Sequence, residues 1–215
     1  ICYREIGDIQ MAEKTFLKAL KMNPDYPYLK GQLQFMKNHL CDWVNYNETK
    51  QNIEKDITQN KKTITPWQAL SVLDSPKLLK DNTMLFIDNK EFNNQNLIDK
   101  KKITLGYFSP DFCEHAVSNQ FKQILKLHDK KKFEIIGFYL NSKQDEKLYE
   151  MKTYFDKFFD INQMSTEDII RLTQVHKVDI AIDLAGYTYS NRYQIFNQRC
   201  APLQVSYLGF AGSTG

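Results

Sequence analysis

Side chains that could carry chemistry gather first in residues 109–115, which read SPDFCEH. Imidazole is the side-chain group best suited to proton transfer near neutral pH, so His115 could accept a proton or donate a hydrogen bond to a phosphate or a sugar. A solvated loop histidine is the plainer alternative. Asp111 could orient the imidazole or cap a following helix, and capping is the simpler interpretation. The segment, which opens with Ser109, predicts one half of a polar site.

A second polar segment, residues 186–192, reads GYTYSNR. Gly186 permits close approach of the backbone to a ligand, and Thr188 offers a hydroxyl. A helix that begins near residue 189 would point free amides at an anion. These features predict a cradle for a sugar or a phosphate. The alternative is an ordinary helix cap followed by an exposed Arg192.

The last residues, 201–215, read APLQVSYLGFAGSTG and form a third candidate. Three glycines follow an apolar run, together with Ser213 and Thr214, which predicts a loop that lines a cleft rather than a linker between domains. The sequence contains neither a GxGxxG segment after the first apolar run nor a GxxxxGK[ST] segment. This disfavours a classical dinucleotide-binding fold and a phosphate-loop nucleotidase.

The elements that must position these loops begin near residue 102. Short apolar runs alternate there with amphipathic segments, which predicts an α/β lobe with a parallel sheet covered by helices. The expected strands are 103–108, 133–140, 158–161, 178–184 and 203–208, and the expected helices are 118–128, 145–156, 166–176 and 190–198. Right-handed crossovers predict the spatial order 3-2-1-4-5, with a crevice at the carboxyl ends of the first and fourth strands. Residues 109–117 and 185–192 should face that crevice.

The first 24 residues carry Gly7, Ala12, Phe16, Ala19 and Pro24 at the spacing of the second half of a tetratricopeptide repeat. The glycine would form the turn between two helices, and the proline would end the second helix. An ordinary amphipathic helix is the alternative. Because about three repeats are needed to bury a core, we expect further repeats upstream and a chain that is part of a longer protein.

Composition excludes several classes of protein. A hydrophobic fraction of 42% and a charged fraction of 26% are typical of globular domains, and no apolar run approaches the roughly 20 residues of a membrane span. The formal net charge is only +3 and the lysines are scattered along the sequence, so we expect neither nucleic acid nor a membrane as a partner. Four widely separated cysteines predict free thiols, and the lack of a secretory leader predicts a cytoplasmic protein.

Five sets of residues, taken together, resemble one protein family. They are the repeat remnant, Cys-Asp-Trp at 41–43, GYFSPDF at 106–112 with His115, DLAGYT at 183–188 with Asn191 and Arg192, and APLQVSYLG at 201–209. In this order, and over nearly the whole chain, they are similar to the O-linked N-acetylglucosamine transferase family, especially its bacterial members.

The resemblance implies a two-lobed GT-B fold. This chain would hold tetratricopeptide-repeat end and capping helices at 1–60, a linker with short helices at 61–101, and the first Rossmann-like catalytic lobe at 102–215. The implied enzyme is inverting and uses neither metal nor cofactor. It moves N-acetylglucosamine from UDP-GlcNAc to Ser or Thr of a protein or peptide that the upstream repeats hold. His115 corresponds to the histidine proposed as proton acceptor. The residues expected near the substrates are Ser109, Asp111, Gly186, Tyr187, Thr188, Arg192, Gly209, Ser213 and Thr214.

The chain departs from the family pattern in two respects. Ala211 stands where the family commonly has proline, which would loosen that loop. The second lobe, which supplies most UDP contacts in the family, does not follow Gly215, so we expect this chain alone to be inactive. Two other functions stay open: a non-enzymatic, repeat-based scaffold that binds proteins, and a related glycosyltransferase that uses another nucleotide sugar such as UDP-glucose or GDP-fucose.

Overall fold

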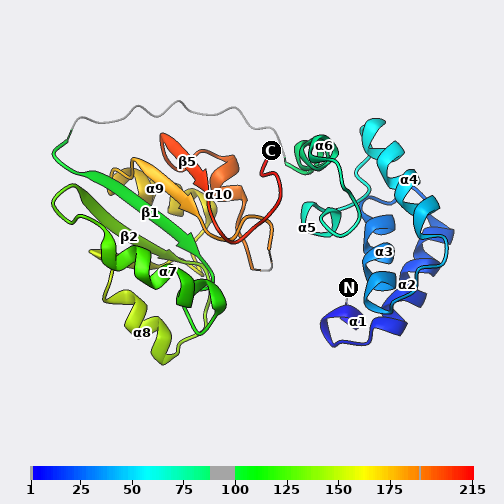
Figure 1. Ribbon diagram of the computed structural model, residues 1–215, viewed down its shortest axis with the longest axis horizontal. Coiled ribbons are helices and arrows are strands. Elements are labelled where there is room, and N and C mark those ends of the chain that lie inside the picture. The colour runs from blue at the N-terminus through cyan, green and yellow to red at the C-terminus, as the bar shows by residue number, and fades with distance from the viewer. Residues whose placement is uncertain (1, 88–99, 189) are drawn as a thin grey trace. The chain divides into compact units, whose positions relative to one another are not determined.

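The computed structural model describes residues 2–87, 100–188 and 190–215 (Figure 1). Contacts divide the chain into a helical unit, Ile1–Asp88 with Gly212–Gly215, and a sheet unit, Asn89–Ala211. Among the described residues, no helix has both the length and the apolar character that crossing a membrane requires.

The helical unit starts with a helix pair that turns at Gly7. This glycine has a φ of +79°, a conformation that glycine adopts without steric strain. Asp8 caps the next helix by accepting a hydrogen bond from the Met11 amide, and the helix ends before Pro24 as predicted. The helices of the unit are α1 (Cys2–Glu5), α2 (Ile9–Met22), α3 (Leu29–His39), α4 (Tyr46–Thr58), α5 (Pro66–Ala69) and α6 (Pro76–Phe86).

Two apolar clusters hold these helices together. The first joins α2 to α3 through Ala12, Phe16, Leu29 and Met36. The second joins α4 to the segment that follows it, through Ile53, Ile57, Ile64, Ala69, Val72 and Leu73. Residues 61–87 of the expected linker therefore contribute to a core, whereas residues 88–99 lie outside the described residues.

The sheet unit is a five-stranded parallel sheet in the order β3-β2-β1-β4-β5, which confirms the predicted topology. The strands are β1 (Ile103–Ser109), β2 (Phe133–Tyr139), β3 (Lys157–Asp160), β4 (Ile180–Asp183) and β5 (Leu203–Ser206). The helices are α7 (Ala116–Leu127), α8 (Glu146–Lys152), α9 (Thr166–Val175) and α10 (Gln194–Asn197).

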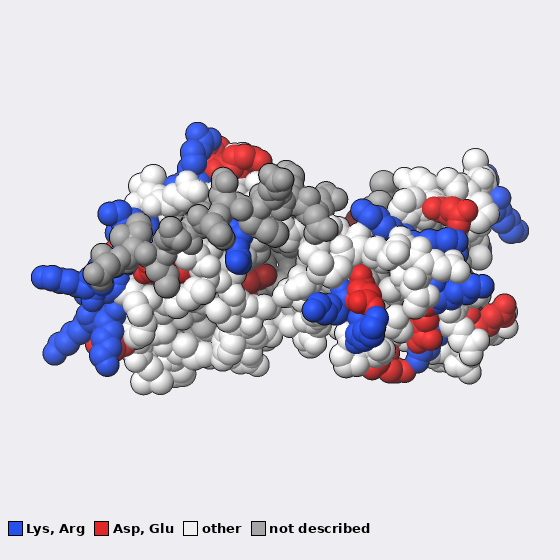
Figure 2. Space-filling model, turned by 90° about the horizontal axis from the view of Figure 1, so that it is seen from above, with Lys and Arg blue, Asp and Glu red and all other residues white. Residues whose placement is uncertain are grey.

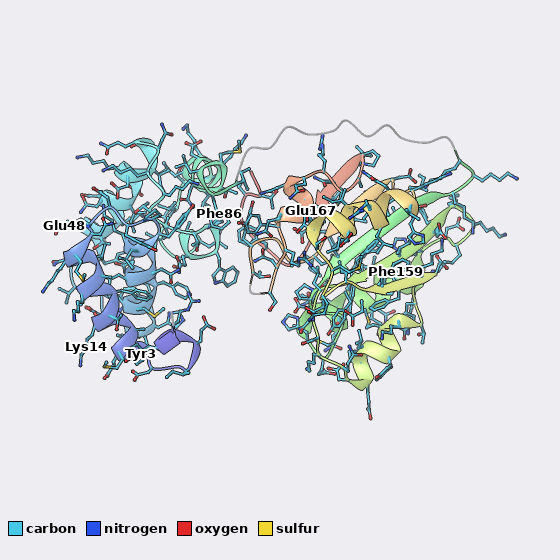
Figure 3. The ribbon with its side chains drawn as sticks, turned by 180° about the vertical axis from the view of Figure 1, so that it is seen from behind. Tyr3, Lys14, Glu48, Phe86, Phe159 and Glu167 are labelled. Carbon is cyan, nitrogen blue, oxygen red and sulfur yellow. The ribbon has the colours of Figure 1, made fainter. Side chains whose placement is uncertain are left out.

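Helices cover both faces of the sheet. The side chains of α7 and α8 pack on one face with Leu105 and Ile135, and those of α9 and α10 pack on the other with Phe108 and Ile136. Figure 3 views the second face, with Phe159 labelled on β3 and Glu167 at the start of α9. The fold class is therefore the predicted one, all-α helices followed by a Rossmann-like α/β lobe.

The expected helix at 190–198 is only partly formed. Its first residue, Ser190, has a φ of +61°, which lies outside the helical region, and α10 spans only Gln194–Asn197. The prediction was wrong at this end because the backbone turns after β4 before it enters the helix.

Candidate functional site

All three segments that the sequence singled out follow the carboxyl ends of strands, which lie at one end of the parallel sheet. β1 pairs with β4 in register from Leu105 and Ile180 to Phe108 and Asp183. The chain then continues from β1 toward α7 on one face and from β4 toward α10 on the other (Figure 1). Neighbouring parallel strands whose connections leave to opposite faces form the crevice in which open α/β sheets bind ligands.

The loop after β1 is anchored by its own backbone. The buried Ser109 hydroxyl accepts a hydrogen bond from the Asp111 amide at 2.9 Å, and the Ser118 hydroxyl donates to the Asp111 carbonyl. Phe112 is fully buried beneath the loop. Ser109 therefore shapes the loop through an accepted hydrogen bond, which leaves its own hydroxyl hydrogen available to donate.

His115 occupies the N-cap position of α7. Its Nδ1 accepts a hydrogen bond from the Val117 amide at 3.2 Å, and its side chain is 48% exposed. An imidazole nitrogen that accepts an amide hydrogen carries no proton, so the neutral ring holds its proton on Nε2. In this arrangement His115 offers the site an N–H donor.

Asp111 lies beside His115, with its Oδ2 3.7 Å from Nδ1. Burial raises the pKa of the Asp111 carboxyl above its usual value, and the charge of His115 acts in the opposite direction. Asp111 does not cap α7, contrary to the simpler interpretation, because the helix begins five residues later and His115 supplies the cap. Because Nδ1 carries no proton in this arrangement and lies 3.7 Å from Oδ2, Asp111 makes no hydrogen bond that orients the ring.

The loop after β4 is built around Asp183. Its Oδ1 accepts hydrogen bonds from the amides of Ala185 at 2.9 Å and Gly186 at 3.0 Å. The Thr188 hydroxyl donates to the Ala185 carbonyl at 2.8 Å, which leaves its oxygen lone pairs available to accept a hydrogen bond. The amides of Ala185 and Gly186 are thus already occupied. The helix that was expected to offer free amides near residue 189 begins only at Gln194.

Residues 209 and 210, which follow β5, pack against the loop after β4. A Cβ added to Gly186, whose φ is +56°, would lie 2.8 Å from Cγ of Phe210. The buried Tyr187 ring packs edge-on against Phe210 at 5.4 Å between ring centroids. Gly209 passes so close to the backbone of Leu184 that an added Cβ would lie 2.6 Å from its carbonyl carbon. Residues 184–187 and 209–210 therefore form one interlocked wall.

Comparison with known proteins identifies the family to which the chain belongs. The model of glycosyl transferase family 41 matches residues 58–215. The chain belongs to glycosyltransferase family 41.

Relatives of this family 41 chain include two proteins of Arabidopsis thaliana, the probable UDP-N-acetylglucosamine–peptide N-acetylglucosaminyltransferases SEC and SPINDLY. SEC is 33% identical over 116 residues, which are 54% of this chain and 12% of SEC. SPINDLY is 33% identical over 125 residues, 56% of this chain and 14% of SPINDLY. This chain thus spans about an eighth of the length of these relatives.

A solved structure of a variant O-GlcNAc transferase from Thermobaculum terrenum has a similar fold. The two agree with a TM-score of 0.55 at 15% identity, over 97% of this chain and 48% of that one. At this level of sequence identity, the similarity is one of fold.

Arg192 of the family 41 chain is held by the protein itself. Its guanidinium donates to the carbonyls of Ile161 and Met164, at 3.3 and 2.7 Å, and to the Thr166 hydroxyl at 3.1 Å. Burial lowers the pKa of Arg192. The side chain therefore ties the loop after β4 to the loop after β3, instead of standing exposed as the alternative interpretation had it.

Ser213 and Thr214 belong to the helical unit by their contacts. The Ser213 carbonyl accepts a hydrogen bond from the Thr83 hydroxyl of α6 at 3.1 Å. The structure groups the other predicted site residues in the sheet unit: Ser109, Asp111, His115, Gly186, Tyr187, Thr188, Arg192 and Gly209. In the described part of the chain, no group of three or more His, Cys, Asp or Glu side chains could hold a metal ion.

Sequence reasoning missed Asp183 and Phe210 as members of the site. Asp183 is 8% exposed and holds the loop, while Phe210 fills the space under Gly186. A carboxylate at the end of the apolar run IAID was the available signal, because a charged residue is rarely buried without partners. Phe210 had no such signal, since its partner lies 24 positions away.

Substituting Asp183 by asparagine is expected to change how stability depends on pH. Burial raises the pKa of Asp183 above the ordinary 3.8, and the Gly186 and Ala185 amides only partly offset this. The native state then binds the proton more tightly than the unfolded state, so stability from this group is present below pH 3.8 and is lost as pH rises through the folded pKa. Asparagine keeps an acceptor oxygen and does not ionise.

Denaturant unfolding of both proteins from pH 4 to pH 7 measures this difference. We expect Asp183→Asn to gain stability relative to the unsubstituted protein as pH rises. A larger loss of stability at pH 7 than at pH 4 would contradict this expectation and show that the charge itself is needed for the loop.

Proposed function

We propose that the protein containing this chain transfers N-acetylglucosamine from UDP-GlcNAc to serine or threonine hydroxyls of proteins. The names of the relatives support both the donor and the peptide acceptor. The observation that carries the proposal is that, in a family 41 chain, the loops with His115 and Thr188 leave neighbouring strand ends at the sheet's switch point.

Inverting transfer forms the bond from the acceptor oxygen to the sugar as the bond from the sugar to the diphosphate breaks. The acceptor hydroxyl must lose its proton, which can end on a phosphate oxygen of the departing UDP, and that diphosphate must be stabilised. Because Nδ1 of His115 accepts the Val117 amide, we propose that Nε2–H donates a hydrogen bond to an oxygen of the donor. A role as proton acceptor at Nε2 would require the other tautomer and the loss of that cap bond. In that tautomer Nδ1 would carry a proton, and Asp111, whose Oδ2 lies 3.7 Å from Nδ1, is proposed to accept it in a hydrogen bond and so orient the ring.

The wall of residues 184–187 and 209–210, extended to Thr188, is proposed to line the sugar side of the site. The Thr188 oxygen would accept a hydrogen bond from a sugar hydroxyl, since its own hydrogen is donated to Ala185. Gly186, Tyr187 and Gly209 would shape the wall, and Arg192 would hold it against the loop after β3. Ser109 would set the loop that carries Asp111, while Ser213 and Thr214 are proposed to contact the acceptor.

The partner and the location are also proposals. We propose a peptide acceptor held by tetratricopeptide repeats, of which the α1–α2 pair with its Gly7 turn would be the last. The division into residues 1–60, 61–101 and 102–215 goes with this proposal. A cytoplasmic enzyme that needs no metal completes it.

Transfer of labelled sugar to a serine-containing peptide tests the function. The full-length protein that contains this chain should transfer label from UDP-GlcNAc, and more slowly or not at all from UDP-glucose and GDP-fucose. The control is the same peptide with alanine in place of every serine and threonine, which should receive no labelled sugar. A preference for another donor would change the assigned substrate, and no transfer from any donor would support the scaffold.

A further inference from the structure

The edge of the sheet opposite the proposed site collects lysines from four separate segments. Lys100–Lys102 precede β1, Lys130–Lys132 precede β2, Lys157 begins β3, and Lys177 precedes β4. Parallel strands all begin at one edge, so these eight side chains, here called the lysine edge, come together. The Ile103 amide donates to the Lys132 carbonyl at 2.9 Å, and the Lys100 ammonium donates to the Lys177 carbonyl. Figure 2 shows basic side chains gathered at this end of the sheet unit.

Half of the lysines in the lysine edge form ion pairs and half do not. Four of its lysines pair with carboxylates: Lys100 with Asp179, Lys130 with Asp156, Lys132 with Asp129 and Lys157 with Glu134. The other four, Lys101, Lys102, Lys131 and Lys177, are exposed, and within the described residues none has a carboxylate at ion-pair distance. Among the described residues, the edge therefore holds four lysines whose charge no carboxylate at ion-pair distance balances.

Exposed apolar side chains lie among these lysines. Val175, at the end of α9, is 74% exposed and lines a hollow of about 640 Å³ together with Lys100–Lys102 and Lys177. Leu127, at the end of α7, is 83% exposed, three positions before Lys130. The two helices cover opposite faces of the sheet, so the apolar side chains are spread across the edge.

Against the expectation from the scattered lysines that no membrane is a partner, we propose that the lysine edge binds the surface of an anionic membrane, with Leu127 and Val175 entering the headgroup region. Basic side chains near acidic lipids together with a few exposed apolar ones are the features by which proteins lie on such surfaces. A partner that touches both helix ends at once must be broad, which favours a membrane over a peptide in one groove. Single-stranded nucleic acid is disfavoured because both of these highly exposed side chains are aliphatic and offer no ring for base stacking.

Vesicle sedimentation of the 215-residue chain tests the proposal. We expect binding to vesicles of 70% phosphatidylcholine and 30% phosphatidylserine, none to pure phosphatidylcholine, and weaker binding at high salt. Replacing Lys101, Lys102, Lys131 and Lys177 by glutamine should reduce partitioning more than tenfold, since each lysine near such a surface contributes about fivefold. Leu127→Ser with Val175→Ser should also weaken binding, at unchanged charge.

The matched control replaces four exposed lysines of the helical unit by glutamine. Lys14, Lys18, Lys21 and Lys80 lie on α2 and α6, and their loss changes the net charge equally. The control should bind like the unsubstituted chain, and thermal unfolding checks that every variant is folded. Equal losses in both fourfold variants, or no binding of the unsubstituted chain, would overturn the proposal. The proposal would also be overturned if the chain bound an acidic peptide or single-stranded RNA as tightly as the acidic vesicles, and if Leu127→Ser with Val175→Ser left vesicle binding unchanged. If a variant fails to fold, the proposal is tested by how vesicle binding of the unsubstituted chain depends on phosphatidylserine content and on salt concentration.

Discussion

Replacing His115 by asparagine is expected to lower kcat/KM for sugar transfer by about 10²–10³-fold in the protein that contains this chain, because one hydrogen-bond donor to the leaving group is lost. Asparagine is a good N-cap, so its side-chain oxygen can replace Nδ1 as acceptor for the Val117 amide. It places no group where Nε2 stands. Initial rates with UDP-GlcNAc and a peptide acceptor measure the effect, and the unfolding temperature should not fall.

His115→Ala separates the two roles of the residue. Alanine removes both Nε2 and the cap acceptor, so it should show the same loss of transfer and also lower the free energy of unfolding by about 1 kcal/mol. If His115→Asn retains full activity and His115→Ala loses it, the histidine acts through the helix cap and not on the substrates. This result would remove His115 from the proposed chemistry while leaving the family assignment intact.

Gly209→Ala is expected to be the most damaging single substitution in the site wall, lowering the free energy of unfolding by about 3 kcal/mol or more. The added Cβ would meet the Leu184 carbonyl and lie 3.1 Å from Cα of Ala185. Both contacts are to backbone, and that backbone is held by β4 and by Asp183, so neither side can yield cheaply. Denaturant unfolding measures the loss, and transfer by the full-length protein should fall with it.

Gly106→Ala, in the middle of β1, is the control for this prediction. Its added Cβ would lie 3.0 Å from side-chain atoms of Phe138 and Val178, which can shift by a few tenths of an ångström. We therefore expect a smaller loss, about 1–2 kcal/mol. A Gly209→Ala variant as stable as Gly106→Ala would mean that the loop after β4 can move away from residue 209, and that the wall is not interlocked.

Sequence patterns predicted the sheet because the signal for each strand is local. Apolar runs bounded by polar segments located all five strands, and the handedness of crossovers gave their order. The ends were less predictable. The start of α10 depends on a left-handed backbone at Ser190, which no side-chain period reports. The tautomer of His115 likewise depends on its place at the N-cap, and a helix that began one or two residues earlier or later would remove the cap bond.

The amino-acid sequence alone determined which residues form strands, which loops end them, and the family that carries those loops. Only the tertiary structure decided what meets across the sheet. The packing of Gly209 on Leu184 and the gathering of lysines from residues 100–177 both depend on register between strands far apart in sequence. Lysines that are scattered along the chain converge because every strand of a parallel sheet starts at the same edge. Local patterns encode the conformation of a segment, but contacts between segments arise only when the whole chain has folded.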